Sequence, residues 1–174
     1  MALYDKAVQD VKARMARAAR EAGRDPAEVT LLAVSKTFPS AAIRAVHATG
    51  QRAFGENYVR EGAAKRAELA DLPELELVLI GPLQGNKTRE AAAVFDRVES
   101  VDRLKIAERL SAQRPANRAP LEVLVQVNIS GESTKSGVPP SEAVALARSV
   151  AALPRLSFRG FMGIAEPTAD IARQ

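Results

Sequence analysis

Short apolar segments alternate with longer segments of helical periodicity along most of the chain, and this alternation is the strongest constraint on its fold. Six candidate strands begin near Thr30, Arg52, Leu75, Arg97, Leu121 and Leu156. The intervening helices are predicted over residues 40–49, 57–70, 87–95, 102–113 and 140–152. A repeat of about 21 to 35 residues is typical of successive βα units in a parallel sheet, so we predict an α/β fold.

Two parallel architectures share this pattern, a doubly wound sheet and a (β/α)₈ barrel. The doubly wound sheet usually carries a glycine-rich phosphate loop after an early strand, but here residues 35–39 (Ser-Lys-Thr-Phe-Pro) follow the first strand and no G-x-G-x-x-G motif is present. We therefore predict a TIM-type (β/α)₈ barrel, truncated after about six βα units and preceded by an extra helix over residues 2–22. Because six strands would leave an open seam of exposed strand edges, we expect residues 1–174 to form a single barrel domain that is incomplete at its C-terminal end.

The first predicted strand leads into a lysine. Residues 31–34 (Leu-Leu-Ala-Val) are an unbroken apolar run, which is typical of a strand buried on both faces, and Lys36 follows directly after Ser35. Ligands bind at the carboxyl ends of parallel strands, so Lys36 is expected at the mouth of the barrel. Our hypothesis is that its amine is a covalent handle for an aldehyde cofactor, and the alternative is a solvated loop lysine.

The other strand ends would share this mouth: Gly55 to Asn57, Gly81 to Lys87, Asn128 to Gly137, and Met162-Gly163. A lysine that condenses with an aldehyde must be partly neutral near pH 7, and apolar walls or neighbouring cations lower a lysine pKa. We predict that Val34, Ile80 and Met162 supply the walls and that Lys135 supplies the charge. Asn57 either contacts the ligand or caps a helix, and these residues alone do not select a cofactor.

Local signals predict how the helices begin and which faces they bury. Asn57, Asn86, Asp102 and Ser141 are predicted N-caps. Asp25 and Pro26 predict a single helical turn before the first strand. In the N-terminal helix, the predicted apolar stripe consists of Leu3, Ala7, Val11, Met15, Ala18 and Ala22.

Composition excludes several classes of site. The chain has no cysteine and a single histidine, His47, which excludes thiolate metal sites and argues against any metal centre or Ser-His-Asp triad. The net charge of +4 raises the question of nucleic acid, but the basic residues are spread along the chain and only 4% of residues are aromatic. No signal peptide or transmembrane segment is visible, so we expect a cytoplasmic protein with no membrane or nucleic-acid partner.

A set of motifs in the order of the chain resembles one family closely. The motifs are residues 33–37 (AVSKT), 54–58 (FGENY), 80–87 (IGPLQGNK), 126–129 (QVNI), 135–137 (KSG) and 159–162 (RGFM). They are similar to the pyridoxal phosphate homeostasis proteins, the YggS/PROSC family, over nearly the whole chain. The resemblance implies a single barrel like the N-terminal domain of alanine racemase, with pyridoxal 5′-phosphate (PLP) on Lys36 as a Schiff base.

The chain departs from the family pattern at two places. The family usually has an aromatic-His pair on the third strand, where this chain has Val78-Leu79, so one wall of the site is expected to differ. The family also continues for two more βα units, which carry the Ser/Gly-rich cradle for the cofactor phosphate. The phosphate-binding residues are therefore expected to lie outside this sequence.

Three functions are weighed. The first is a carrier or buffer of PLP in vitamin B6 homeostasis, with PLP-dependent apo-enzymes as recipients and the protein itself a monomer. The second is a PLP-dependent enzyme, racemase-like or decarboxylase-like, and the third is a basic nucleic-acid binder. Racemisation needs an acid/base group on each face of the substrate, and alanine racemases take the second from a tyrosine of an added β domain. This chain has only Tyr4 and Tyr58 and no such domain, so we favour the carrier without catalytic residues.

Overall fold

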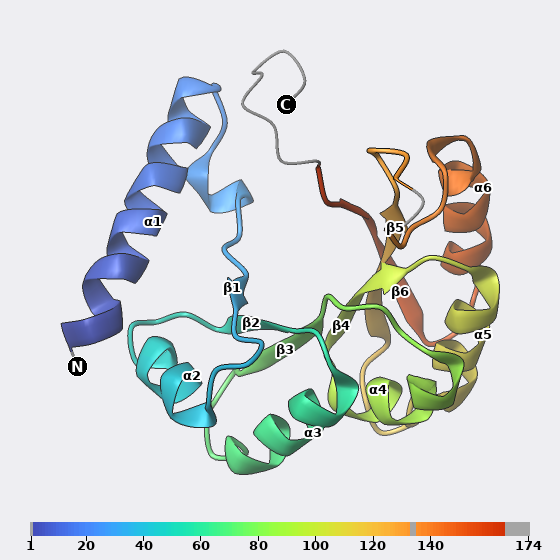
Figure 1. The fold of residues 1–174 in the computed structure, drawn as a ribbon, viewed down its shortest axis with the longest axis horizontal. Helices are drawn as coiled ribbons and strands as arrows, with labels where there is room; N and C mark the ends of the chain where they lie inside the picture. The colour runs from blue at the N-terminus through green and yellow to red at the C-terminus, as the bar shows by residue number, and fades with distance from the viewer. Residues whose placement is uncertain (1, 133–134, 166–174) are drawn as a thin grey trace.

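Helices and parallel strands alternate in a computed structural model that describes residues 2–132 and 135–165 (Figure 1). The strands are β1 (Ala33–Val34), β2 (Ala53–Glu56), β3 (Glu76–Leu79), β4 (Arg97–Val101), β5 (Leu121–Val127) and β6 (Leu156–Gly163). The α-helices are α1 (Ala2–Glu21), α2 (Ser40–His47), α3 (Val59–Glu68), α4 (Thr88–Val94), α5 (Leu104–Gln113) and α6 (Pro140–Ala151). Short 3₁₀ turns cover Pro26–Glu28 and Gly85–Lys87.

The strand order identifies the type of α/β fold. The sheet runs β1-β2-β3-β4-β5-β6, and every neighbouring pair is parallel. A doubly wound sheet reverses its strand order at a switch point, whereas a TIM-type barrel adds each strand beside the previous one. The barrel-type arrangement predicted from the sequence is therefore confirmed. Among the described residues, β1 and β6 are the two edges of the sheet.

The two faces of the sheet differ in chemistry. Helices α2 to α6 follow one another along the outer side of the sheet, while α1 stands beyond β1 (Figure 1). Facing these helices is a fully buried apolar layer that includes Phe54, Leu77, Leu79, Val98, Val123 and Val125. The alternate residues of β3, β4 and β5 face the other way, and among them Arg97 forms ion pairs with Glu76, Glu99 and Glu122. The alternation follows from the strand period of two.

The prediction that residues 31–34 form a strand buried on both faces is wrong. β1 contains only Ala33 and Val34, and Val34 is 51% exposed. The reason is its place in the sheet, since β1 lies at an edge with β2 as its only neighbour in the described part of the chain. An unbroken apolar run does not distinguish an edge strand from a central one.

Helix faces and helix starts also differ from the predictions. Among the α1 side chains that the structure describes, which do not include Leu3, Ala19 is buried and Val11 is exposed, so the face turned inward is offset by one residue from the predicted stripe. The structure assigns the N-cap positions of α3 to α6 to Tyr58, Lys87, Arg103 and Pro139, none with a side-chain cap. The predicted caps Asn57, Asn86, Asp102 and Ser141 are therefore wrong. The predicted turn after Asp25 is confirmed, because Asp25 accepts a hydrogen bond from Ala27 N–H at 2.9 Å.

No helix in residues 2–132 or 135–165 combines the length and apolar character needed to cross a bilayer.

Candidate functional site

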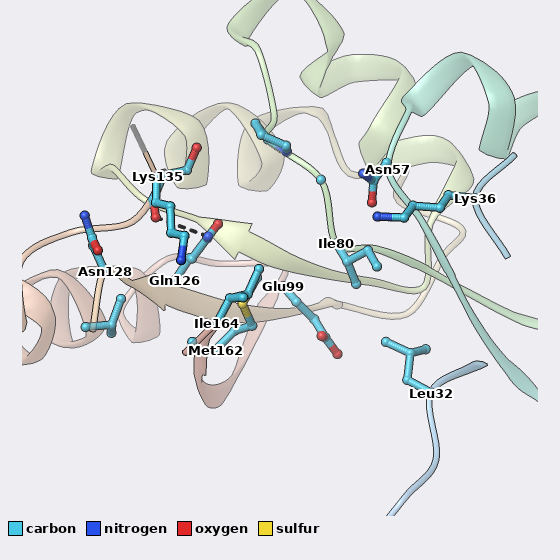
Figure 2. Close-up of a pocket in the computed structure, with 15 residues that line it drawn as sticks. Leu32, Lys36, Asn57, Ile80, Glu99, Gln126, Asn128, Lys135, Met162 and Ile164 are labelled. Carbon is cyan, nitrogen blue, oxygen red and sulfur yellow. Dashed lines mark hydrogen bonds between the residues drawn. The ribbon is translucent and has the colours of Figure 1, made fainter. Parts of the chain in front are cut away.

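The carboxyl ends of the strands surround a cavity of about 490 Å³. Its lining comes from the ends of β2, β3, β5 and β6, from β4, from the residue before β1 and from the loops after β1 and β5: Leu32, Lys36, Asn57, Ile80, Gly81, Pro82, Glu99, Gln126, Val127, Asn128, Lys135, Ser136, Met162, Gly163 and Ile164. Figure 2 shows Lys36 and Asn57 on one side of this cavity and Lys135, Asn128 and Gln126 on the other. The strand-end rule thus gathers residues that are far apart in the sequence.

Five of the six predicted site residues line this cavity: Lys36, Asn57, Ile80, Lys135 and Met162. Lys36 is an exposed side chain at the rim, just beyond the point where Ser35 N–H extends the ladder to Gly55 O at 2.9 Å. Val34 does not reach the cavity. It lines a separate apolar pocket with Tyr4 and Phe38, because alternate residues of a strand point to opposite faces.

Leu32 takes the place predicted for Val34 and lines the cavity with Ile80 and Met162. Val78 and Leu79, where the family pattern has an aromatic-His pair, are fully buried and do not line the cavity. The apolar wall on this side is therefore formed by the residue that follows β3 rather than by β3 itself.

The loop after β5 is fixed by backbone and amide hydrogen bonds. Asn128 N–H donates to Val138 O and Val138 N–H donates to Gln126 O, both at 2.9 Å. The side chain of Gln126 donates to Ser136 O at 3.2 Å (Figure 2). Asn128 accepts from Gly131 N–H at 3.0 Å and donates to Glu132 O at 2.8 Å. Gln126 and Asn128 therefore hold Ser136 and Lys135 at the cavity.

A close backbone crossing sets the spacing of two strand tips. A Cβ atom on Gly81 would lie 2.2 Å from the carbonyl oxygen of Asn57, which no side chain can accommodate. Glycine at position 81 lets the end of β3 approach the residue after β2, so Asn57 and Ile80 reach the same cavity.

Three titratable side chains line the cavity. Lys135 forms an ion pair with Glu132, and Lys135 is the first cause that holds the pKa of the Glu132 carboxyl below its usual range. Glu99 was missed by the sequence analysis because it lies inside a strand. Its Oε1 lies 3.3 Å from Arg97, whose guanidinium has a raised pKa: burial alone would lower it, but the carboxylates of Glu76, Glu122 and Glu99 outweigh that effect.

Other residues singled out in the sequence lie elsewhere. Lys87 and Gln84 line a neighbouring pocket that shares Asn57 and Pro82 with the cavity. His47 is buried with its Nε2 2.9 Å from Pro73 O. Among residues 2–132 and 135–165, no group of three or more His, Cys, Asp or Glu side chains could hold a metal ion.

The lining is compatible with a small aldehyde. A volume of about 490 Å³ lies within the usual range for small-molecule sites, roughly 300–1,000 Å³. Leu32, Ile80 and Met162 line the cavity with apolar side chains, and the Asn57 amide is a polar group in the same lining. The Lys36 amine is a nucleophile at the rim.

Comparison with known proteins decides the family. The model for the N-terminal domain of alanine racemase matches residues 8–172. The pyridoxal phosphate homeostasis protein of Pseudomonas aeruginosa is 59% identical over 167 residues, which cover 96% of this chain and 72% of the relative. This chain belongs to the pyridoxal phosphate homeostasis protein family. The Escherichia coli member is 50% identical over 94% of this chain and 71% of its own length.

Two solved structures share the fold. PipY of Synechococcus elongatus, a structure with PLP bound, superimposes with a TM-score of 0.75 and 40% identity, and covers 91% of this chain and 73% of PipY. An alanine racemase of Clostridium difficile has a TM-score of 0.66 at 17% identity, covering 82% of this chain and 37% of the racemase. The predicted relation to the alanine racemase N-terminal fold is confirmed.

Proposed function

We propose that this protein binds PLP reversibly through Lys36 and carries or buffers the cofactor in intracellular vitamin B6 homeostasis. The observation that carries the proposal is the position of Lys36, a primary amine at the rim of a cavity built from the strand ends. The P. aeruginosa relative carries the name pyridoxal phosphate homeostasis protein, and the PipY structure contains PLP.

In the proposed complex, the bound cofactor supplies an aldehyde carbon as the electrophile. The Lys36 nitrogen adds to that carbon and water leaves, and addition of water reverses the step and releases the cofactor. Leu32, Ile80 and Met162 exclude water from the aromatic ring. Asn57 and Ser136 offer hydrogen bonds to its polar groups.

We infer that the protein is a carrier rather than an enzyme. Racemase chemistry needs an acid/base group on each face of the substrate. Neither tyrosine that the sequence offers lines the cavity: Tyr58 is 64% exposed and lines the neighbouring pocket, and Tyr4 lines the apolar pocket near Val34. Glu99 and Lys135 do line the cavity, but each is held in an ion pair, with Arg97 and Glu132 respectively.

The proposal extends to the setting of the protein. We propose a cytoplasmic monomer whose recipients are PLP-dependent apo-enzymes and which binds neither nucleic acid nor membranes. Several of the basic residues that raise the net charge to +4 are engaged in ion pairs: Arg97 pairs with Glu76, and both Arg66 and Arg118 pair with Asp96. Residues that hold the cofactor phosphate are proposed to lie outside this sequence.

The test is to locate and quantify the adduct. With PLP in excess, the protein should develop an absorption band near ~420 nm, and borohydride reduction followed by peptide mapping should find the pyridoxyl group on Lys36. Lys36→Ala should lose the band and the Lys36 peptide adduct. Lys87→Ala is the matched control, a lysine of another strand-end loop outside the cavity, and should behave as wild type.

Two outcomes would overturn the proposal. An adduct spread evenly over exposed lysines would mean that the cavity does not select Lys36. Turnover of an amino acid by the PLP-loaded protein, lost in Lys36→Ala, would establish the enzyme instead.

A further inference from the structure

A buried ion cluster lies directly behind the Lys36 loop, on the side of the sheet that faces α3. It consists of Glu56 at the end of β2 and Glu61 and Lys65 on α3. The Lys65 ammonium donates to Glu56 Oε1 at 2.7 Å, to Glu61 Oε1 at 2.7 Å and to Ser35 O at 2.8 Å. An ammonium has three N–H donors, so this group has a partner for each of them.

The cluster holds the residues on both sides of Lys36. Ser35 Oγ–H donates to Glu56 Oε1 at 2.5 Å, and the carbonyl of Ser35 accepts from Lys65. On the other side, Thr37 N–H donates to Glu61 Oε1 at 2.8 Å. The backbone is therefore tied at positions 35 and 37 while the Lys36 side chain between them lines the cavity.

The Thr37 backbone needs this support. Its φ of +66° is in the left-handed region, which a β-branched residue rarely adopts and which is held only where surrounding contacts favour it. The Thr37 N–H bond to Glu61 is such a contact, and it lies in the segment between β1 and α2.

Burying charged groups costs desolvation free energy, so we expect the cluster to have a role beyond packing. The side chains of Lys65 and Glu56 are 6% and 0% exposed, and Glu61 is 26% exposed. Apolar residues of similar volume often stabilise a protein as well as a buried ion pair does. What apolar residues could not supply is hydrogen bonds to the Ser35 hydroxyl and carbonyl and to the Thr37 N–H. The cluster is specific for the loop that carries Lys36.

We infer that Glu56, Glu61 and Lys65 are positioning residues that hold the Lys36 loop so that the Lys36 amine enters the cavity. This inference rests on the proposed function, because it takes Lys36 as the residue that reacts with PLP. The cluster acts through the backbone at Ser35 and Thr37 and does not touch the aldehyde.

The test compares three variants. Glu61→Ala removes the acceptor of Thr37 N–H, and we expect the second-order rate constant for imine formation at Lys36 to fall on the order of tenfold. Glu61→Gln keeps a carbonyl oxygen in that position and should stay within about threefold of wild type. Ser35→Ala removes a hydroxyl bonded to Glu56 and should lie between them. Because Glu61 is partly exposed, these first two variants are expected to fold.

A second measurement needs no PLP. Competitive labelling with acetic anhydride and peptide mapping gives the reactivity of Lys36 relative to Lys87 in the same molecule. Glu61→Ala should change this ratio at least threefold, whereas Val150→Ala, which truncates a fully buried side chain on α6, should lower stability and leave both readouts at the wild-type value.

The outcomes separate the two proposals. If wild type forms no imine at Lys36, the proposed function fails, and the labelling ratio still tests the positioning role. If wild type reacts and Glu61→Ala matches it in rate and labelling ratio, the positioning role is overturned. It is also overturned if Val150→Ala lowers the imine rate as much as Glu61→Ala does, since the effect is then one of stability.

Discussion

Lys36 and Lys65 lie on opposite sides of one short loop and have opposite surroundings. Lys36 is exposed and lines the cavity, where solvent and small molecules can reach its amine. Lys65 is 6% exposed and donates to two carboxylates and a carbonyl, so an aldehyde cannot reach it. Two lysines in the same region of the fold thus differ in accessibility: the amine of Lys36 is open to small molecules, whereas that of Lys65 is hydrogen-bonded to the backbone and carboxylates beside it.

A lysine that reacts at an exposed rim needs support from neighbouring residues that do not react. A long side chain at an exposed rim has many rotamers, and ordering it costs free energy. When the backbone is fixed at Ser35 and Thr37, less conformational entropy is lost on ordering the Lys36 side chain between them. Such a site therefore depends on supporting contacts that do not themselves touch the ligand.

The largest effect expected from this difference is on stability. Lys65→Met should lower the free energy of unfolding by about 3–5 kcal/mol, because it leaves the fully buried Glu56 carboxylate without its charged partner. Lys36→Met should change it by about 0.5 kcal/mol or less, because Lys36 is an exposed side chain. Urea unfolding monitored by circular dichroism measures both.

The double variant Lys65→Met/Glu56→Gln is the control for that explanation. Removing the carboxylate charge should recover part of the loss, although the amide still has to find partners. If Lys65→Met and Lys36→Met were equally stable, the buried pair would contribute nothing measurable and the contrast between the two lysines would collapse.

Most of the residues that line the cavity around Lys36 and were named as site residues could be predicted from the sequence. Lys36, Asn57, Ile80, Lys135 and Met162 were placed together because strand ends converge in any parallel barrel, whatever the side chains are. That rule depends only on the order of strands and helices, which the apolar pattern reveals. Val34 was misplaced because a shift of one residue along an edge strand moves a side chain to the opposite face.

The cluster side was missed, and the reason is physical. Lys65 lies in a helix segment with Arg60, Glu61 and Arg66, which has the composition of a solvated helix face. Its burial depends on how α3 packs over the end of β2, which no local pattern reveals. One signal was available: Glu56 is two residues after Phe54, so strand alternation points both toward the helices, where a carboxylate needs a buried cation.

An effect of intermediate size is expected on the pH dependence of stability. The hydrogen bond from Lys65 is the first cause that lowers the pKa of Glu61, with the Thr37 N–H also contributing. A carboxyl whose pKa is lower in the folded state stabilises the fold above the unfolded pKa, and this contribution is lost as the pH falls through the folded value. Wild type should therefore exceed Glu61→Gln in stability by about 1 kcal/mol at pH 7, and the difference should shrink below about pH 4.5.

Urea unfolding of both proteins between pH 7 and pH 3 measures this difference. Glu68→Gln is a control on the same helix, at an exposed position, and its difference from wild type should vary less with pH. A Glu61→Gln difference that stays constant down to pH 3 would contradict the lowered pKa.

The smallest effect is expected on the cavity side, from Glu132→Gln. Lys135 lines the cavity opposite Lys36 in Figure 2, but its charge is compensated by Glu132. Removing the carboxylate leaves a positive charge facing the cavity, which disfavours a second ammonium there. The pH at which half of Lys36 forms the imine should therefore move down, by roughly a few tenths of a unit because solvent and salt screen the charge. A titration of the imine band measures the shift, which should diminish in 1 M salt, where the Debye length is about 3 Å.

Lys135→Met/Glu132→Gln should return the midpoint toward wild type. An unchanged midpoint in Glu132→Gln at low salt would mean that Lys36 does not feel the Lys135 charge, and that the backbone cluster behind the loop, rather than the cations around the cavity, is what prepares Lys36 to react.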